Sequence, residues 1–243
     1  MKKSFVGIFT LIMVGINFSV EYFTLNGLTR FQIIESIPIY FLPSMYVYNI
    51  WYVIYIGLIA FAIYLFFSKK DLEKDLAKWI YITYLSNFAW IFTWHFSFTS
   101  LAVIAVLIQF FSLIQIYIII WKEKKPLFPY GVFRIYFAWI LIATISNIAA
   151  VNYLARGGEY LVSAEWTASV IMAIITFFAF LTLKIHKDCL FATVIAWAIF
   201  GILVKHFYTS DIIVNTAILL FILLVIGIVV NAVNMHILKP PKS

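Results

Sequence analysis

The fold is decided by the stretch Ile218-Leu219-Leu220-Phe221-Ile222-Leu223-Leu224-Val225-Ile226-Gly227-Ile228-Val229-Val230, near the end of a 243-residue chain. A transmembrane β-strand alternates apolar and polar residues over about ten positions. This stretch does not alternate, and the apolar segment around it, about 211–237, has the roughly 17–25 residues that a membrane helix needs. The stretch therefore indicates a membrane-spanning helix.

Apolar runs of similar length recur along the whole chain. Hydrophobic residues make up 65% of the sequence and charged residues 11%, and the mean hydropathy is +1.05. This composition is far from that of a soluble domain. We predict an all-α, polytopic membrane protein with about eight transmembrane helices. Their expected ranges are 5–24, 46–67, 77–96, 99–121, 132–154, 166–183, 189–205 and 211–237.

The basic residues lie almost entirely between the predicted spans. With a cytoplasmic N-terminus, 14 of the 17 Lys and Arg residues fall on the cytoplasmic side, and only Arg30, Arg156 and Lys205 fall on the other. This asymmetry is the positive-inside pattern. It predicts that both termini are cytoplasmic and that the lipid bilayer is the main partner. Because the charge follows topology, the net charge of +7 does not indicate a nucleic-acid partner.

Three segments place asparagine and tryptophan inside apolar runs. They are Asn49-Ile50-Trp51 with Tyr55, Asn87-Phe88-Ala89-Trp90 with Trp94, and Trp139 with Asn147. An amide without a partner in hydrocarbon costs several kcal/mol, so such groups tend to face a bundle interior. Asn87, Trp90 and Trp94 are spaced to share one helical face. The segments predict an aromatic-lined interior. The alternative is that the tryptophans are interfacial anchors, Trp94 above all, and that the asparagines join helices.

The same segments resemble the TspO/MBR family, the tryptophan-rich sensory and translocator proteins. Residues 43–55 resemble its proline-led Trp-x-x-x-Tyr segment, and Asn87-Phe88-Ala89-Trp90 resembles its Asn-x-x-Trp. Residues 139–147 match its pattern Trp-x-x-x-Ala-Thr-x-x-Asn. The three matches occur in order on the second, third and fifth spans. The sequence departs from the family's proline pattern in two places. No proline follows Trp90, and the approach to the second span keeps only Pro38 and Pro43.

The resemblance implies a five-helix core at residues 1–155 and a three-helix C-terminal extension at 156–243, within one membrane domain. It also implies a pocket that binds porphyrins and, in some members, sterols or synthetic ligands. By position, the residues that would line or support this pocket are Trp51, Asn87, Trp90, Trp139, Ala143 and Asn147. Tyr55 and Trp94, which share helical faces with Trp51 and Trp90, complete the predicted ligand-binding set.

The connection at residues 25–45 is the longest between the predicted spans. Its segment 28–35 has a short amphipathic pattern that could lie on the outer membrane surface, and Pro38 and Pro43 then break any helix. Two roles stay open for this connection. It is either an interfacial connector or a lid over a pocket in the bundle.

The sequence contains no pattern for catalysis or metal binding. None of its acidic residues is central in a span, and it has neither a phosphate-binding glycine loop nor a nucleophile elbow. Cys189 is the only cysteine, and the four histidines show no ligand spacing; His95 is the one expected near the pocket mouth. We predict no enzyme activity, no metal and no obligatory cofactor, with a porphyrin as the candidate ligand.

We therefore expect a membrane receptor or carrier for a hydrophobic, planar, tetrapyrrole-like molecule. The ligand would stack on Trp51, Trp90 and Trp139 and hydrogen-bond to Asn87 or Asn147. The main alternative is a secondary transporter, or permease, for a small amphipathic solute. A membrane enzyme that degrades its bound ligand is a less favoured alternative. A homodimer stays open, because apolar residues cover every helix face.

Overall fold

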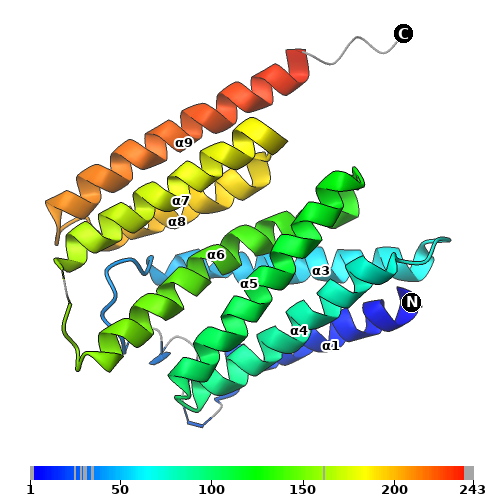
Figure 1. Ribbon diagram of the computed structural model, residues 1–243, viewed down its shortest axis with the longest axis horizontal. Coiled ribbons are helices and arrows are strands. Elements are labelled where there is room, and N and C mark those ends of the chain that lie inside the picture. The colour runs from blue at the N-terminus through cyan, green and yellow to red at the C-terminus, as the bar shows by residue number, and fades with distance from the viewer. Residues whose placement is uncertain are drawn as a thin grey trace. The chain divides into compact units, whose positions relative to one another are not determined.

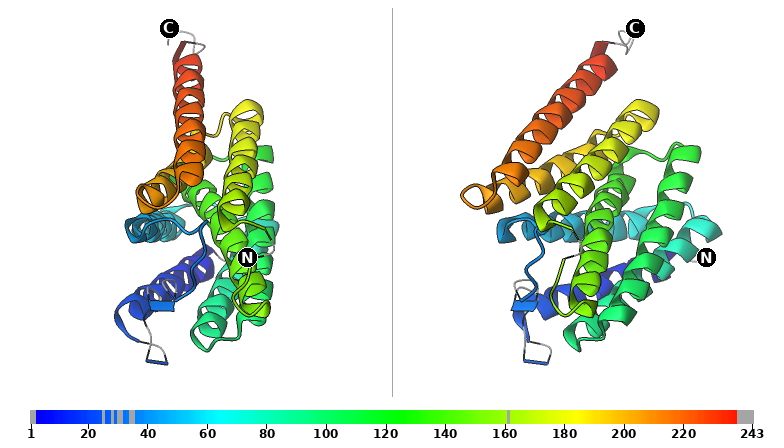
Figure 2. Two further views of the ribbon diagram at one scale, coloured as in Figure 1. Left: turned by 90° about the vertical axis from the view of Figure 1, so that its left-hand side faces the viewer. Right: turned by 60° about the vertical axis from the view of Figure 1, so that its left-hand side comes forward.

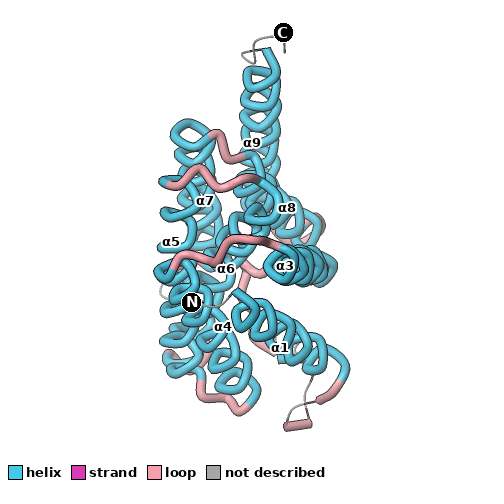
Figure 3. The backbone as a smooth tube through the Cα atoms, turned by 90° about the vertical axis from the view of Figure 1, so that its right-hand side faces the viewer, coloured by secondary structure: helices cyan, strands magenta, loops and turns pink. Residues whose placement is uncertain are grey.

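The computed structural model of the protein describes residues 3–24, 26–27, 29, 32–33, 36–160 and 162–237. These residues contain helices and loops and no strand (Figure 3). A 3-10 helix, η1 (Met45–Asn49), leads directly into α3. The α-helices are α1 (Lys3–Tyr22), α3 (Ile50–Phe67), α4 (Lys74–His95), α5 (Thr99–Lys122), α6 (Leu127–Ala155), α7 (Ala164–His186), α8 (Cys189–His206) and α9 (Asp211–Ile237).

The described helices coincide with the predicted spans, but α4 differs from the rest in polarity. Seven helices in the described residues are long and apolar enough to cross a membrane, and α4 is not among them. Its first two turns carry Lys74, Asp75 and Lys78, and Asn87 and His95 lower its hydropathy further. The prediction of an all-helical integral membrane protein is confirmed, and the eighth span depends on α4.

The chain divides into two compact units, of which the first holds α1, α3, α4, α5 and α6. Within it, α1 packs on α3, α3 on α6, α6 on α5, α5 on α4, and α4 on α1 (Figure 1). The five helices therefore close into a ring. The expected boundary between residues 155 and 156 stays a prediction; the first unit ends at Glu159.

The ring is held by close approach of α3 and α6. A Cβ atom added to Gly57 would lie only 2.6 Å from Cγ2 of Val132, so the two backbones approach where glycine leaves room. One turn further along α3, the ring of Phe61 meets Phe133 edge to face at 5.0 Å and Tyr130 at 5.6 Å. This geometry suits aromatic pairs. The contact buries Leu58 and Phe61 completely.

The second unit contains α7, α8 and α9, together with residues 39–48. The three helices pack on one another pairwise and run side by side in both views of Figure 2. Asp188 begins α8, and its carboxylate accepts a hydrogen bond from the backbone N–H of Phe191 at 3.2 Å. That bond satisfies one of the free donors at the helix N-terminus.

The predicted amphipathic segment at 28–35 lies largely outside the described residues. The choice between connector and lid for the 25–45 connection therefore stays open. Further along, Ile37, Ile39, Phe41 and Leu42 are buried.

An ion cluster joins the loop before α4 to the loop between α5 and α6. The Lys125 ammonium donates to the Glu73 carboxylate and lies 2.8 Å from an Oε2 of Glu123. Partial burial raises the pKa of Glu73, but the hydrogen bond and charge of Lys125 lower it more, so it ends below 4.5. Burial lowers the pKa of Lys125, but its bonds to Glu123 and Glu73 raise it above 10.5.

We expect Glu73→Gln to lower stability by less than about 1 kcal/mol at neutral pH, because the pair is partly exposed and screened by solvent. The Glu73 contribution is complete above pH 4.5 and is lost as the pH falls through its lowered pKa. The Lys125 contribution is complete below pH 10.5 and is lost as the pH rises through its raised pKa. The melting temperatures of the wild type and of Glu73→Gln, measured across this pH range, test these limits. Asp71→Asn, in the same loop, is the control: it removes a carboxylate that lies outside the ion pairs of Lys125 and should lower the melting temperature less than Glu73→Gln does.

Candidate functional site

An aromatic cluster forms where α3 meets α6. The Trp51 ring stacks on Tyr55, one turn along α3, with centroids 5.7 Å apart. It also meets two rings of α6 edge to face, Tyr136 at 5.8 Å and Trp139 at 6.3 Å. Stacked and edge-to-face pairs are the arrangements that aromatic rings favour. The structure thus brings together three of the predicted site residues, Trp51, Tyr55 and Trp139.

A cluster of amides lies next to these rings, between α1 and α4. The Asn17 side-chain N–H donates to Oδ1 of Asn87 at 2.7 Å and to the Met13 carbonyl at 3.0 Å. The Tyr55 hydroxyl donates to Oδ1 of Asn17 over a long 3.4 Å. Asn87 is fully buried, and its Nδ2 has no hydrogen-bond partner within the described part of the chain. This donor is the unsatisfied group of the cluster.

Sequence reasoning missed Asn17, although a signal was present. Asn17 is a lone amide inside the apolar run 5–24, as Asn87 and Asn147 are in theirs. Gln109 is a second omission of the same kind. It is fully buried on α5, and its Nε2 donates to the hydroxyl of Tyr136 at 2.6 Å.

A second hydrogen bond crosses the interior of the ring from α4 to α6. The indole N–H of Trp90 donates to Oδ1 of Asn147 at 3.0 Å. The Asn147 amide in turn donates to the Ala143 carbonyl at 2.7 Å, one turn back along α6. Since α5 lies between α4 and α6 in the ring, this bond passes through the bundle. It joins three further predicted residues, Trp90, Ala143 and Asn147.

Trp94 and Asn49 lie differently from these clusters. Trp94 is 8% exposed, so this residue near the end of α4 is buried in the bundle. Asn49 is exposed, and the expectation that its amide faces the interior is wrong. It is the last residue of η1, where the chain is only entering α3. An amide at a span end meets water or headgroups and needs no buried partner.

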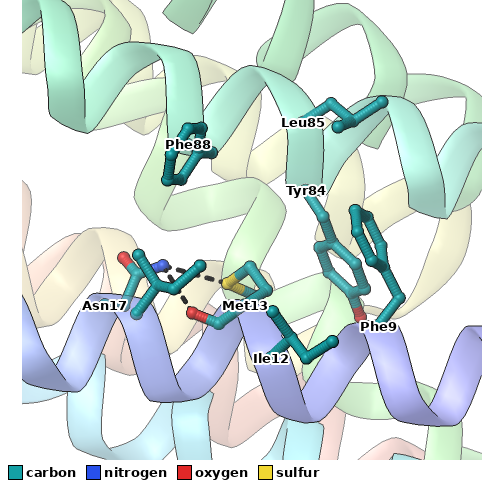
Figure 4. Close-up of a pocket in the computed structure, with 8 residues that line it drawn as sticks. Phe9, Ile12, Met13, Asn17, Tyr84, Leu85 and Phe88 are labelled. Carbon is teal, nitrogen blue, oxygen red and sulfur yellow. Dashed lines mark hydrogen bonds between the residues drawn. The ribbon is translucent and has the colours of Figure 1, made fainter.

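The structure describes a pocket of about 240 Å³ between α1 and α4 (Figure 4). Asn17 and Met13 lie on the α1 side, and Tyr84 and Phe88 face them from α4. The lining residues are Phe9, Ile12, Met13, Ile16, Asn17, Tyr84, Leu85 and Phe88. Its polar groups are the Asn17 amide and the Tyr84 hydroxyl, which accepts a hydrogen bond from Thr10 at 3.2 Å.

One side chain, that of Asn17, connects the pocket to the predicted residues. None of the eight predicted ligand-binding residues lines the pocket, but Asn17 does, and it is hydrogen-bonded to Asn87. Trp51, Tyr55 and Trp139 are buried against one another. A ligand that stacked on these rings would have to separate them. Their role as ligand contacts stays a prediction.

A family model described as TSPO-like protein matches residues 3–230. The chain belongs to the TSPO-like protein family. In this TSPO-like protein the match extends well beyond residue 155, through α7, α8 and most of α9. The suspected family is confirmed. No curated protein and no solved structure matches the chain.

Family and architecture agree on the broad kind of protein. The TSPO-like match and the apolar helices make it an integral membrane protein. Its aromatic clusters within these helices fit a membrane receptor or carrier. Within the described residues no group of three or more His, Cys, Asp or Glu side chains could hold a metal ion.

Proposed function

We propose that this TSPO-like protein is a membrane receptor or carrier for a hydrophobic, planar small molecule, with tetrapyrroles as the leading class. The observation that supports it most is the pocket between α1 and α4. Its rim consists of the exposed apolar side chains Ile12, Leu85 and Phe88, and Asn17 supplies a polar group inside it. A ligand dissolved in the bilayer could enter such a pocket sideways, between two helices.

The lining suits the apolar body of a flat molecule. The rings of Phe9, Tyr84 and Phe88 offer stacking surfaces, each worth about 0.5–1.5 kcal/mol beyond area burial. The Asn17 amide and the Tyr84 hydroxyl are each only 1% exposed and already hydrogen-bonded within the protein, so the surface offered to the ligand is almost entirely apolar. Drug-sized ligands usually occupy about 300–1,000 Å³, so a pocket of about 240 Å³ holds one edge of a macrocycle and leaves the rest against lipid.

Binding in this proposal is passive and needs no catalytic group. We place the lysine-rich loops, and with them both termini, on the cytoplasmic side of a prokaryotic cell membrane, following the positive-inside pattern. The pocket residues Asn17 and Phe88 lie toward the end of α1 and α4 that is remote from Lys3 and Lys74. Because Phe9 and Ile12 also line it, the pocket would be reached near the middle of the bilayer.

The test is a titration of purified protein with protoporphyrin, followed by the absorbance of the porphyrin. We expect saturable binding to the wild type and about tenfold weaker binding to Ile12→Trp, whose larger ring fills the pocket at a cost of about 1–3 kcal/mol. Ile108→Trp is the matched control, because Ile108 is 47% exposed on α5, close to the 51% of Ile12, and lies outside the pocket lining.

Two outcomes would contradict the proposal. Binding that does not saturate in the wild type would rule out a specific porphyrin site. Equal affinities of Ile12→Trp and Ile108→Trp would place any saturable site away from the pocket between α1 and α4.

A further inference from the structure

The ten residues before α3 are packed on the C-terminal helices. We call residues 39–48 the entry segment, because it leads the chain into α3 (Figure 1). The entry segment belongs to the compact unit of α7, α8 and α9, whereas α3 itself belongs to the other unit. Ile39, Phe41, Pro43 and Val47 are buried within the entry segment.

Hydrogen bonds hold the entry segment to one helix, α8, at points along its length. The Ser44 backbone N–H donates to the Gly201 carbonyl at 3.1 Å. The Trp197 indole N–H donates to the Val47 carbonyl, also at 3.1 Å. At the other end, Nε2 of His206 lies 3.0 Å from the Tyr40 carbonyl. These bonds satisfy two carbonyls and one amide of a segment that is irregular before η1 begins at Met45, and such groups would be costly to bury unpaired.

Aromatic ring contacts also attach both ends of the entry segment to α8. The Tyr40 ring stacks on His206 with centroids 5.2 Å apart and planes 11° apart. The Tyr46 ring meets Trp197 edge to face at 5.2 Å. Each end thus combines a hydrogen bond with a ring contact.

Gly201 is the point of closest approach. A Cβ atom on Gly201 would lie 2.1 Å from Cγ2 of Val47 and 3.0 Å from Cβ of Pro43. Real Cβ atoms do not approach other carbons to 2.1 Å, so any side chain at this position forces Val47 to shift. Only glycine lets the entry segment lie this close to α8.

The entry segment is joined to the aromatic cluster by continuous helix. The residues from Met45 to Phe67 form a single helical stretch, in which η1 passes into α3 at Ile50. Trp51 is the second residue of α3, four residues after Val47. A shift of Val47 is therefore carried along a short helical connection to Trp51.

We propose that α8 acts as a clamp that fixes the entry segment and thereby sets the position of Trp51 in the aromatic cluster. The role of the C-terminal helices is then to position the start of α3. They hold the entry segment, which leads directly into α3, with Trp197, Gly201 and His206 as positioning residues. Any effect of the clamp on ligand affinity rests on the proposed function, whereas its effect on α3 does not.

The test is amide hydrogen exchange in purified, full-length protein, measured for the peptides that cover residues 39–48 and 51–58. In Gly201→Ala we expect exchange in both peptides to rise about tenfold, because local opening becomes easier where packing is strained. Val47→Ala removes the methyl groups that clash with the new Cβ. The double variant Val47→Ala/Gly201→Ala should therefore return to within about threefold of Val47→Ala alone.

Gly227→Ala is the matched control. A Cβ at Gly227 would lie 2.7 Å from the Phe180 ring, so this variant strains packing between α7 and α9 without contact to the entry segment. It should leave residues 51–58 unchanged. If Gly201→Ala does not fold, Trp197→Phe keeps an aromatic ring but removes the hydrogen bond to Val47, and a smaller rise in both peptides is expected.

A rise confined to residues 39–48 would overturn the proposal, because the entry segment would then move without affecting α3. An equal rise at residues 51–58 in Gly227→Ala would also overturn it. Protoporphyrin affinity, measured in parallel, should fall in Gly201→Ala and recover in the double variant. Failure of the wild type to bind protoporphyrin would count against the proposed function alone, since the exchange result is independent of ligand.

Discussion

Trp51→Ala is expected to lower the free energy of unfolding by about 3–5 kcal/mol, the usual cost of emptying a large aromatic site in a core. Trp51 is 3% exposed and lies between Tyr55, Tyr136 and Trp139. Its removal leaves a cavity and ends three ring contacts at once. Neighbouring helices cannot close the gap easily, because Gly57 and Val132 already hold α3 against α6 at close range.

Unfolding of the purified protein in mixed micelles, followed by circular dichroism, measures this effect. Trp166→Ala is the control, since Trp166 is 58% exposed on α7, and its loss should change stability by about 0.5 kcal/mol or less. Equal effects of the two variants would show that Trp51 is not packed as described.

Removing the Asn17 amide is expected to cost about 1–3 kcal/mol, since it leaves Asn87 buried with neither side-chain atom paired. Asn17→Leu removes the donor to Oδ1 of Asn87 and the acceptor of the Tyr55 hydroxyl. The Asn87 Nδ2 group already has no partner within the described residues. The remaining amide would then be an unsatisfied polar group in an apolar bundle.

The double variant Asn17→Leu/Asn87→Leu should lose less stability than the sum of the two single variants, because replacing both partners leaves no unpaired amide. Hydrogen bonds between membrane helices average about 0.6 kcal/mol with a maximum near 1.7, so a coupling of about 1 kcal/mol is expected. Asn231→Leu serves as control, because Asn231 bonds to the Gly227 carbonyl of its own helix. Additivity of the cycle within about 0.3–0.5 kcal/mol would contradict the pairing.

Helix positions could be predicted from the sequence where apolar runs end sharply. The expected spans 46–67, 99–121 and 211–237 agree with the helical stretches Met45–Phe67, Thr99–Lys122 and Asp211–Ile237 to within a residue. The expected span 132–154 begins later than α6, which starts at Leu127, is non-helical at Phe128 and continues as regular helix from Pro129. Hydropathy marks the part of a helix in hydrocarbon, whereas the helix itself continues into the headgroup region.

The candidate site was predicted in part. Helical spacing predicted one face for Trp51 and Tyr55, and their rings stack in the structure. Spacing along one helix does not say which faces of different helices meet. The bonds from Trp90 to Asn147 and from Asn17 to Asn87 depend on the order of helices in the ring. The pocket between α1 and α4 could not be predicted for the same reason, because it exists only where the two helices meet.

The low hydropathy of α4 has a consequence for how the protein is made. Charged residues and amides raise the cost of moving a helix from the translocon into lipid, and α4 is the least apolar of the described α-helices. It is followed after three residues by α5, which is strongly apolar and packs along it. We infer that α4 enters the bilayer as the weaker arm of a hairpin with α5. The polar residues that give the mature bundle Asn87 and its partners thus make one helix dependent on the next during synthesis.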